Sequence, residues 1–234
     1  MNQNMTFTVV MLAVLGLLVG ALVYMSNRPP APSGTAGTSA AAPGGRGAAA
    51  TPSPAPAELL VREDSRYLDD VEDAPVTVVE FLDFECEACR AQFPVMERIR
   101  EDYGGRIDFV VRYFPLPGHA NSRPAAAAVE AAAQQGALEG MYARMYETQA
   151  EWGESRQDQS EVFVGFAEEL GLDVAEFTAA MESQEVADRV QADFDDGVAL
   201  GVQGTPTIFV NGYRTQSMPT YEELAELIDA GLAE

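Results

Sequence analysis

Cysteine, histidine and lysine are scarce in this sequence of 234 residues: it has two cysteines, one histidine and no lysine, so its 14 basic residues are all arginine. Two cysteines cannot form a scaffold stapled by several disulfides. A zinc site takes about four ligands, and beyond the cysteines the chain offers only His119 and carboxylates, so we expect no bound metal. The 37 acidic residues give a formal net charge of -23, which repels phosphate backbones, so we expect no nucleic-acid partner.

Charge is also absent from residues 6–25, an apolar run of about the twenty residues that a helix needs to cross a bilayer. A cleaved signal peptide is the alternative, but no basic residue precedes the run and no small-x-small cleavage site follows Leu22. We therefore expect a short tail at residues 1–5 and an uncleaved, single-pass transmembrane anchor at residues 6–25. The positive-inside rule does not orient this anchor, because Arg28 is the only charged residue near it.

Residues 26–57 consist almost entirely of proline, alanine, glycine, serine and threonine, with Arg28 and Arg46 as the only charges. Such a segment has no apolar periodicity that could form a core, and its prolines keep it extended. We expect a disordered linker that holds the following domain away from the membrane. From Glu58 onward the composition is globular, and we expect one folded domain over residues 58–234.

The expected strands are rich in β-branched and aromatic residues. Residues 76–84 are apolar on both faces apart from a few acidic positions, which is typical of a buried strand. We expect a short first strand at residues 59–61 and a further strand at residues 107–114. The strand predicted for residues 205–210 leads into a hairpin turn at Asn211-Gly212.

Helical periodicity predicts the remaining elements. A helix over residues 86–103 contains Pro94, which should kink it. A helical region, about residues 119–200, interrupts the α/β pattern, and a capping box at Thr220 begins the last helix. Within this region we expect helices at residues 125–135, 138–150, 162–170, 174–181 and 185–200, the last with Val186, Val190, Phe194 and Val198 facing the core. The strand, helix, strand order before the region indicates a parallel pair with Cys86 at a carboxyl end, where α/β sheets bind ligands.

Cys86 and Cys89 are separated by two residues at the start of the first predicted helix, a spacing that favours redox use. Unpaired N–H groups and the positive end of the helix dipole stabilise an anion there, so Cys86 is the candidate nucleophile. Cys89, one turn deeper, would close or resolve the disulfide. No cofactor beyond this redox-active pair is expected.

Several motifs in order resemble the DsbA-like branch of the thioredoxin superfamily, in which a helical insertion interrupts a thioredoxin unit. The resemblance extends from about Val61 to the C-terminus, and the tethered arrangement is similar to that of DsbA-like proteins of Gram-positive bacteria. The motifs that carry it are Ala-Pro-Val-Thr-Val-Val-Glu-Phe-Leu-Asp-Phe at 74–84, Cys-Glu-Ala-Cys at 86–89, Pro94, Arg-Tyr-Phe-Pro-Leu at 112–116 and Gly-Thr-Pro-Thr-Ile-Phe-Val-Asn-Gly at 204–212.

This resemblance implies roles for three further residues. Glu80, a carboxylate in an otherwise apolar strand, would relay protons for Cys89, although an ion-paired structural role is the alternative. Pro206 resembles the family's cis-proline beside the cysteines, which presents backbone to an extended substrate. Thr205 before it would contact Cys86.

The dipeptide Glu87-Ala88 between the cysteines departs from the Pro-His, Pro-Tyr or Pro-Ser that the family's oxidases often carry. We expect Glu87 to raise the pKa of Cys86 by like-charge repulsion and so to set the strength of the oxidant. Asp83 and Glu85 are expected to face solvent. His119 fits a capping or packing residue better than a catalytic base.

The expected function is an extracytoplasmic, membrane-anchored thiol–disulfide oxidoreductase that introduces disulfides into exported proteins. Its expected partners are thiol-bearing exported proteins and a membrane quinone-linked reoxidase of the DsbB or VKOR type. Two alternatives stay open from the sequence: a disulfide reductase, for example in cytochrome c maturation, and a redox-inactive peptide-binding or chaperone module.

Overall fold

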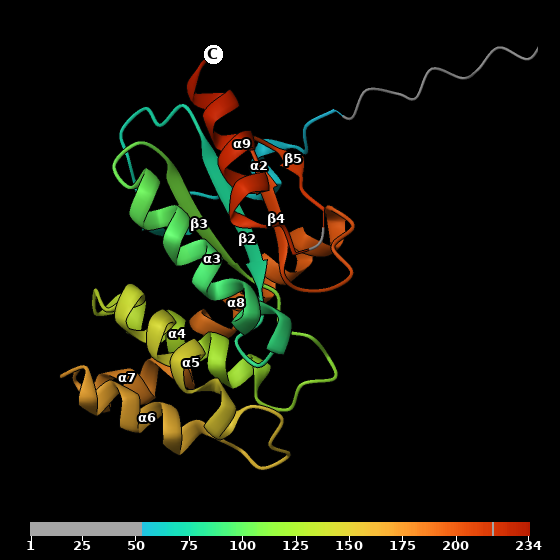
Figure 1. The fold of residues 1–234 in the computed structure, drawn as a ribbon. Helices are drawn as coiled ribbons and strands as arrows, with labels where there is room; N and C mark the ends of the chain where they lie inside the picture. Colours follow the sequence, from blue (N-terminus) through green and yellow to red (C-terminus); the bar gives the residue numbers. More distant parts are fainter. Residues whose placement is uncertain (1–52, 217) are drawn as a thin grey trace, which may run out of the picture. The chain divides into compact units, whose positions relative to one another are not determined.

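The computed structural model describes residues 53–216 and 218–234 (Figure 1). The predicted anchor at residues 6–25 and nearly all of the predicted linker lie outside these residues. Within the described part of the chain, no helix combines the length and the apolar character needed to cross a membrane.

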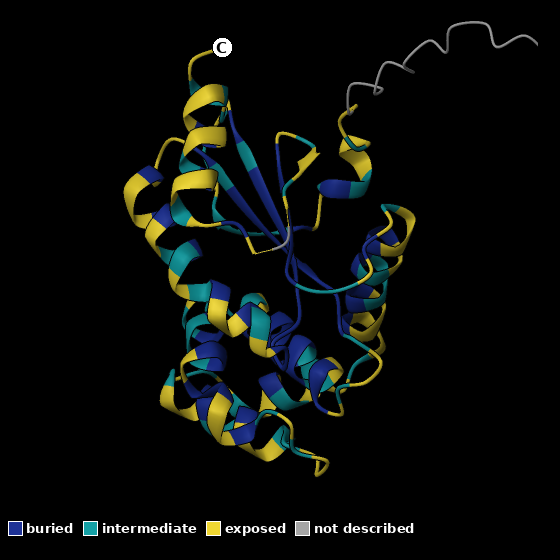
Figure 2. Ribbon diagram, turned by 45° about the vertical axis from the view of Figure 1, so that its right-hand side comes forward, coloured by how far each residue is buried: buried dark blue, intermediate teal, exposed yellow. Residues whose placement is uncertain are grey.

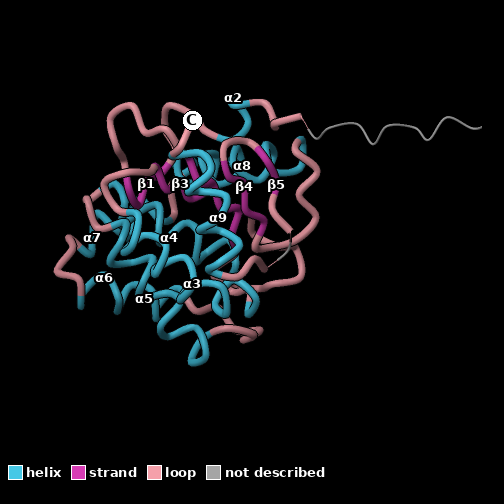
Figure 3. Tube along the Cα trace, turned by 45° about the horizontal axis from the view of Figure 1, so that its top comes forward, coloured by secondary structure: helices cyan, strands magenta, loops and turns pink. Residues whose placement is uncertain are grey.

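One five-stranded sheet organises the domain, with strand order β1-β3-β2-β4-β5. The strands are β1 (Arg66–Asp69), β2 (Thr77–Leu82), β3 (Asp108–Tyr113), β4 (Thr207–Val210) and β5 (Tyr213–Arg214). Strand β2 runs parallel to β3 and antiparallel to β4, so it lies at the centre. This confirms the predicted parallel pair around the helix that begins at the cysteines. Figure 3 shows the strands together in one layer.

Alternating side chains of β2 enter two different cores, because successive residues of a strand point to opposite faces. Val78 and Leu82 pack into the core beneath α3 (Glu87–Tyr103) and α9 (Tyr221–Leu232), whereas Val79 and Phe81 pack into the core beneath α2 (Ala57–Leu60) and α8 (Gln184–Ala199). Figure 2 shows the central strands dark blue, as buried residues. The expectation of a strand buried on both faces is confirmed.

The first predicted strand, residues 59–61, is wrong: residues 57–60 form the short helix α2, and the first strand, β1, begins at Arg66. A run of three apolar residues cannot distinguish a strand from a buried helical turn. Here the turn lets Leu60 reach the second core while the carbonyls of Leu59 and Leu60 accept hydrogen bonds from Arg112.

The helical insertion is confirmed. Its helices are α4 (Ser122–Gln134), α5 (Leu138–Trp152), α6 (Ser160–Glu169) and α7 (Val174–Met181), and α8 follows them. Trp152 is buried in the insertion with its ring edge-on to Phe163. Val186 and Val190 are buried as predicted, but Val198 is 53% exposed, contrary to expectation. An α-helix repeats every 3.6 residues, so positions spaced by four drift around it by about 40° per step and leave the core face.

The C-terminal elements also match their sequence signals. Asn211 and Gly212 both have positive φ, 47° and 83°, in the turn between β4 and β5. Thr220 and Glu223 form both hydrogen bonds of the predicted capping box at the start of α9.

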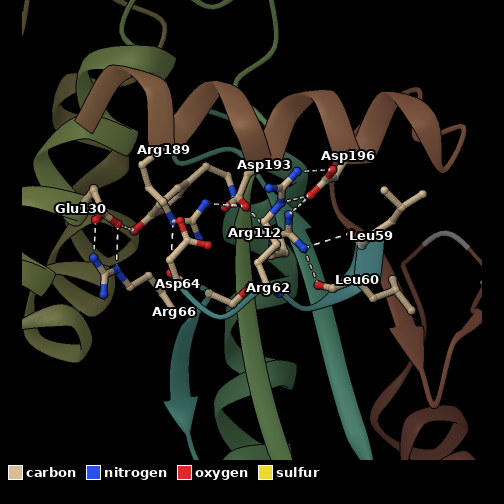
Figure 4. Close-up of polar contacts among 12 residues, drawn as sticks. Leu59, Leu60, Arg62, Asp64, Arg66, Arg112, Glu130, Arg189, Asp193 and Asp196 are labelled. Carbon is tan, nitrogen blue, oxygen red and sulfur yellow. Dashed lines mark hydrogen bonds and ion pairs between the residues drawn. The ribbon is translucent and has the colours of Figure 1, made fainter. Parts of the chain in front are cut away.

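A network of ion pairs, buried at its centre and partly exposed at its ends, joins β1 and the segment before it to β3, α4 and α8 (Figure 4). At its centre Arg112 of β3 is completely buried and contacts Asp193 and Asp196 of α8 at 2.5 and 2.6 Å. The members are four arginines, Arg62, Arg66, Arg112 and Arg189, and four acids, Asp64, Glu130, Asp193 and Asp196. Since each acid faces at least one guanidinium, the network fixes the segment where the chain enters the domain.

Candidate active site

Cys86 and Cys89 lie at the carboxyl end of β2, on the first turn of α3. Cys86 is the N-cap residue of the helix, with an extended backbone, and Cys89 is one turn further. Both are free thiols, and both are buried, with exposed fractions of 8% and 1%. The predicted position of the pair at a helix N-terminus is confirmed.

The local environment separates the proton affinities of the two thiols. The pKa of Cys86 falls from 9.0 to about 5 because Cys89 and Thr205 donate hydrogen bonds to its sulfur, as do the backbone N–H groups of Cys89 and Ala88, against the opposing effect of burial. Burial raises the pKa of Cys89 well above 9.0, and the hydrogen bond to Cys86 and the charges of Cys86 and Glu80 add to the rise. Cys86 is therefore a thiolate at neutral pH, and Cys89 keeps its proton.

Thr205 and Pro206, in the loop before β4, lie beside the cysteine pair. The peptide bond between them is cis, and the Cys86 sulfur lies 3.4 Å from the carbonyl oxygen of Thr205. The hydroxyl of Thr205 is buried and has no hydrogen-bond partner among the described residues, which leaves it free to donate to the sulfur of Cys86 once that sulfur is a thiolate. Residues 204–208 and 214–216 line a cleft beside this contact. The predicted contact between Thr205 and Cys86 is present.

Glu80 points from β2 toward α3, on the same face of the sheet as Val78 and Leu82. It is 2% exposed, and its Oε2 has no hydrogen-bond partner within the described part of the chain. Burial raises its pKa from 4.5 to about 8, and the charge of Glu97 contributes to the rise. The alternative of an ion-paired structural carboxylate is not what this geometry shows: Glu80 is a buried acid that holds its proton at neutral pH.

Asp83 and Glu85 were expected in solvent, and the structure contradicts this, because they are only 2% and 3% exposed. The carboxylate of Asp83 accepts hydrogen bonds from the backbone N–H groups of Glu85 and Leu116, and that of Glu85 accepts one from the N–H of Asn121. These bonds tie the loop before Cys86 to the loop after β3. These partners could not be predicted, because the donors of the two bonds between the loops are backbone groups 33 and 36 residues away along the chain.

Gln149 of α5 is a further residue of the site that sequence reasoning missed. Its buried side-chain amide donates two hydrogen bonds, 2.7 Å to the carbonyl of Phe84 and 2.9 Å to that of Cys86. The helical insertion thus holds the backbone that enters α3. A polar residue on a helix face otherwise filled by Met145, Tyr146 and Trp152 was the only available signal.

The remaining predicted residues lie around the thiolate. Glu87 is exposed, Ala88 is half-buried, and the carboxylate of Glu87 is not among the main causes of the low pKa of Cys86. His119 is one-third exposed and its Nδ1 lies 2.7 Å from Oδ2 of Asp83. His119 therefore contacts a buried carboxylate, which the capping or packing role that we expected for it does not include.

Comparisons with known proteins agree with this geometry. A sequence model of the family described as Thioredoxin matches residues 71–230. A thioredoxin-like oxidoreductase from Silicibacter pomeroyi DSS-3 superimposes with a TM-score of 0.65 at 26% identity, covering 77% of this chain and 99% of that one. BdbD from Bacillus subtilis, in its oxidised form, superimposes with a TM-score of 0.61 at 24% identity, covering 73% and 94%, which shows a shared fold.

Curated relatives share the sequence over part of their length. The Na(+)/H(+) antiporter NhaA of Herminiimonas arsenicoxydans is 36% identical over 161 residues, which make up 68% of this chain and 24% of the antiporter. The chain spans about a quarter of the length of the curated relatives it matches. The match of the family to most of the chain, the fold and the cysteine pair beside a cis-proline lead to one conclusion: this chain belongs to the thioredoxin family and is a thiol–disulfide oxidoreductase.

Proposed function

We propose that the protein introduces disulfide bonds into exported proteins by exchange through a disulfide between Cys86 and Cys89. The observation that carries this proposal is the placement of the two thiols: Cys86 is the N-cap of α3 beside the cis bond between Thr205 and Pro206, and Cys89 lies one turn deeper and is 1% exposed. This placement lowers the pKa of Cys86 to about 5 and raises that of Cys89 well above 9.0. A stable Cys86 thiolate favours the dithiol form over the disulfide, and a protein whose reduced form is stabilised is an oxidant.

The reaction proceeds by two thiol–disulfide exchanges. A substrate thiolate attacks the sulfur of Cys86, the bond to Cys89 breaks, and Cys89 leaves and takes up a proton. A second substrate thiolate then attacks the substrate sulfur of the mixed disulfide, and Cys86 leaves as a thiolate. The net change converts two substrate thiols into a disulfide and reduces the Cys86–Cys89 pair.

Glu80 fits the role of proton donor in the first step. Its pKa of about 8 means that it carries a proton at neutral pH, in the same interior where Cys89 must be protonated as it leaves. In the reverse direction it accepts that proton, which allows the disulfide to form again. The cleft beside Thr205 and Pro206 would hold the extended substrate.

The cellular setting combines the predicted segments with the chemistry. A single-pass anchor at residues 6–25 and a linker at residues 26–57 would tether the domain to the membrane, and disulfide formation favours the side outside the cytoplasm, where exported thiols are oxidised. A membrane quinone-linked partner of the DsbB or VKOR type would reoxidise the pair. The antiport activity in the names of the curated relatives is not carried over, because the match spans about a quarter of their length.

The reduction potential of the Cys86–Cys89 pair tests the direction of the reaction. The full-length protein is equilibrated with glutathione buffers, and we expect a potential well above the value of about -270 mV typical of thioredoxin. Trapping free thiols in cells should find the pair mostly oxidised. A potential near that of thioredoxin with a mostly reduced pair would instead establish a reductase.

A Cys86→Ser variant tests whether the function is redox chemistry at all. We expect it to lose disulfide exchange completely, because the attacked sulfur is gone. Full activity of this variant in preventing aggregation of an unfolded exported protein, with no exchange in the wild type, would establish the peptide-binding module instead.

A further inference from the structure

The only histidine of the chain lies beside the catalytic loop because of the sheet topology. Strands β2 and β3 are parallel neighbours, so the loops at their carboxyl ends emerge at the same edge. The loop after β2 carries Asp83 and Cys86, and the loop after β3 carries His119. Two hydrogen bonds join the loops: the N–H of Leu116 donates to Asp83 and the N–H of Asn121 donates to Glu85.

Asp83 connects His119 to Cys86. Its completely buried carboxylate lies 2.7 Å from Nδ1 of His119, whose side chain is 32% exposed. Its backbone carbonyl accepts a hydrogen bond from the N–H of Cys86 at 3.1 Å. A buried carboxylate is costly without a cation, and His119 is the one side chain that forms an ion pair with Asp83 among the described residues. The contact therefore favours the imidazolium form of His119.

The charges of His119 and Cys86 are coupled. Burial lowers the pKa of His119, but the hydrogen bond to Asp83 and the charges of Asp83, Glu85 and Cys86 outweigh this and raise it above 6.5. The interaction between two charged sites is reciprocal: if the Cys86 thiolate favours the imidazolium, the imidazolium favours the thiolate equally. The larger contributions to the low pKa of Cys86 are its local hydrogen bonds, so the contribution of His119 is a secondary one.

We propose that His119 is a positioning residue for the redox reaction: Asp83 holds its imidazolium beside the N-terminus of α3, where the positive charge stabilises the Cys86 thiolate. This inference rests on the proposed function, in which a stabilised thiolate makes the disulfide a stronger oxidant. In a chain with a net charge of -23, and with Glu85 and Glu87 close to Cys86, this cation offsets negative charge at the site.

The coupling also predicts a pH dependence. The disulfide form has no thiolate, so His119 binds its proton more tightly in the dithiol form than in the disulfide form. Reduction near neutral pH therefore takes up an extra fraction of a proton, and the potential falls more steeply with pH there. Once pH exceeds the raised pKa of His119, the imidazolium and its contribution are lost. The charged groups that act on His119 are Asp83 and Glu85 of the loop before α3 and Cys86 at its N-cap.

Two substitutions separate the charge of His119 from its hydrogen bond. His119→Gln keeps a donor for Asp83 but has no charge, whereas His119→Lys keeps a positive charge that does not titrate near neutral pH. Arg98→Gln is the matched control: it removes one positive charge from an exposed position on α3 whose pair with Asp102 spans 3.7 Å. All four full-length proteins are measured by thiolate absorbance against pH and by equilibrium with glutathione.

We expect His119→Gln to raise the Cys86 pKa and to lower the equilibrium constant for oxidation of glutathione by about threefold to tenfold, which corresponds to about 15–30 mV. His119→Lys should restore both values and lose the extra pH dependence near neutral pH. Arg98→Gln should match the wild type. The same Cys86 pKa and potential in wild type and His119→Gln would overturn the inference while leaving the proposed function intact, because Cys86→Ser tests that function separately. A potential that falls equally in the Lys and Gln variants would also overturn it, since the loss would then be structural.

Discussion

Buried charge occurs in two regions of the domain, and the two are built in opposite ways. Around Arg112, on the face of the sheet beneath α8, each acid of the network faces a guanidinium (Figure 4). Around the cysteines, Glu80, Asp83 and Glu85 are equally buried, yet no guanidinium pairs with them among the described residues. Backbone N–H groups stabilise the carboxylates of Asp83 and Glu85, and His119 also contacts that of Asp83, whereas Glu80 holds a proton. The paired charges around Arg112 hold the fold, whereas Glu80, which has no cation beside it among the described residues, has a pKa raised to about 8 and so carries a proton that chemistry can use.

The largest effect on stability is expected from removing the central cation of the Arg112 network. Arg112→Leu removes the cation that contacts Asp193 and Asp196 and leaves the carbonyls of Leu59 and Leu60 without a donor. Losing one partner of a buried ion pair costs about 3–5 kcal/mol, so we expect a loss of that size in the free energy of unfolding, measured by urea denaturation. Arg156→Leu, at an exposed position whose side chain makes no ion pair among the described residues, should change it by less than about 0.5 kcal/mol. A loss below about 1 kcal/mol for Arg112→Leu would contradict the assignment.

Replacing the buried acid Glu80 should change the free energy of unfolding in the opposite direction, towards greater stability. The folded protein holds the Glu80 proton up to a pKa of about 8, whereas the ordinary value is 4.5. Because this folded pKa is raised, the carboxyl costs nothing below about pH 4, costs more as pH rises, and reaches its full cost above about pH 8. Glu80→Gln has the shape of the protonated acid and does not titrate. We expect it to raise the free energy of unfolding by about 2–4 kcal/mol at pH 7.

The pH dependence makes this prediction specific. The gain from Glu80→Gln should vanish near pH 4 and grow through neutral pH in urea denaturation of the dithiol form. Glu101→Gln, an exposed change on α3, should show less than about 0.5 kcal/mol at any pH. The same variant should slow disulfide exchange by about tenfold or more, because Cys89 loses its proton donor. A destabilised, fully active Glu80→Gln protein would show that Glu80 belongs with the structural charges.

How far the sequence predicts each region depends on how local its interactions are. The Cys-x-x-Cys spacing, the apolar strand β2 and the capping box at Thr220 are patterns within a few residues, and all were found in place. The cis bond before Pro206 followed from the family resemblance. The sequence also marked Glu80, because one acid among β-branched residues is conspicuous even without knowledge of its partners.

Interactions between distant segments were not predictable. Asp83 and Glu85 look like ordinary loop acids, and only the parallel pairing of β2 and β3 brings the N–H groups of Leu116 and Asn121 to them. The Arg112 network draws on separate segments from Arg62 to Asp196. No period or motif in the sequence encodes such a set.

A smaller loss of stability is expected at Gln149, through which the insertion contacts the loop before α3. Gln149→Ala removes the donor for the buried carbonyl of Phe84, whereas the carbonyl of Cys86 still accepts from the N–H of Arg90 at 3.1 Å. An unsatisfied buried acceptor costs about 1–3 kcal/mol, so we expect a loss in that range, less than for Arg112→Leu. Gln184→Ala, a change at an exposed residue whose side chain donates to Asp188, is the control in the same denaturation assay. If both variants had the same stability, the insertion would not restrain the loop through this residue.

The smallest effect is expected at Glu87, the exposed acid that follows Cys86 in the chain. Its carboxylate lies on the first turn of α3 and opposes the Cys86 thiolate, but water screens it, unlike the buried groups. Glu87→Gln should therefore lower the Cys86 pKa of about 5 by no more than about half a unit. Thiolate absorbance at low and high salt measures this, and the difference should shrink as salt increases. A shift larger than that of His119→Gln would mean that the dipeptide between the cysteines, and not the buried surroundings, sets the strength of the oxidant.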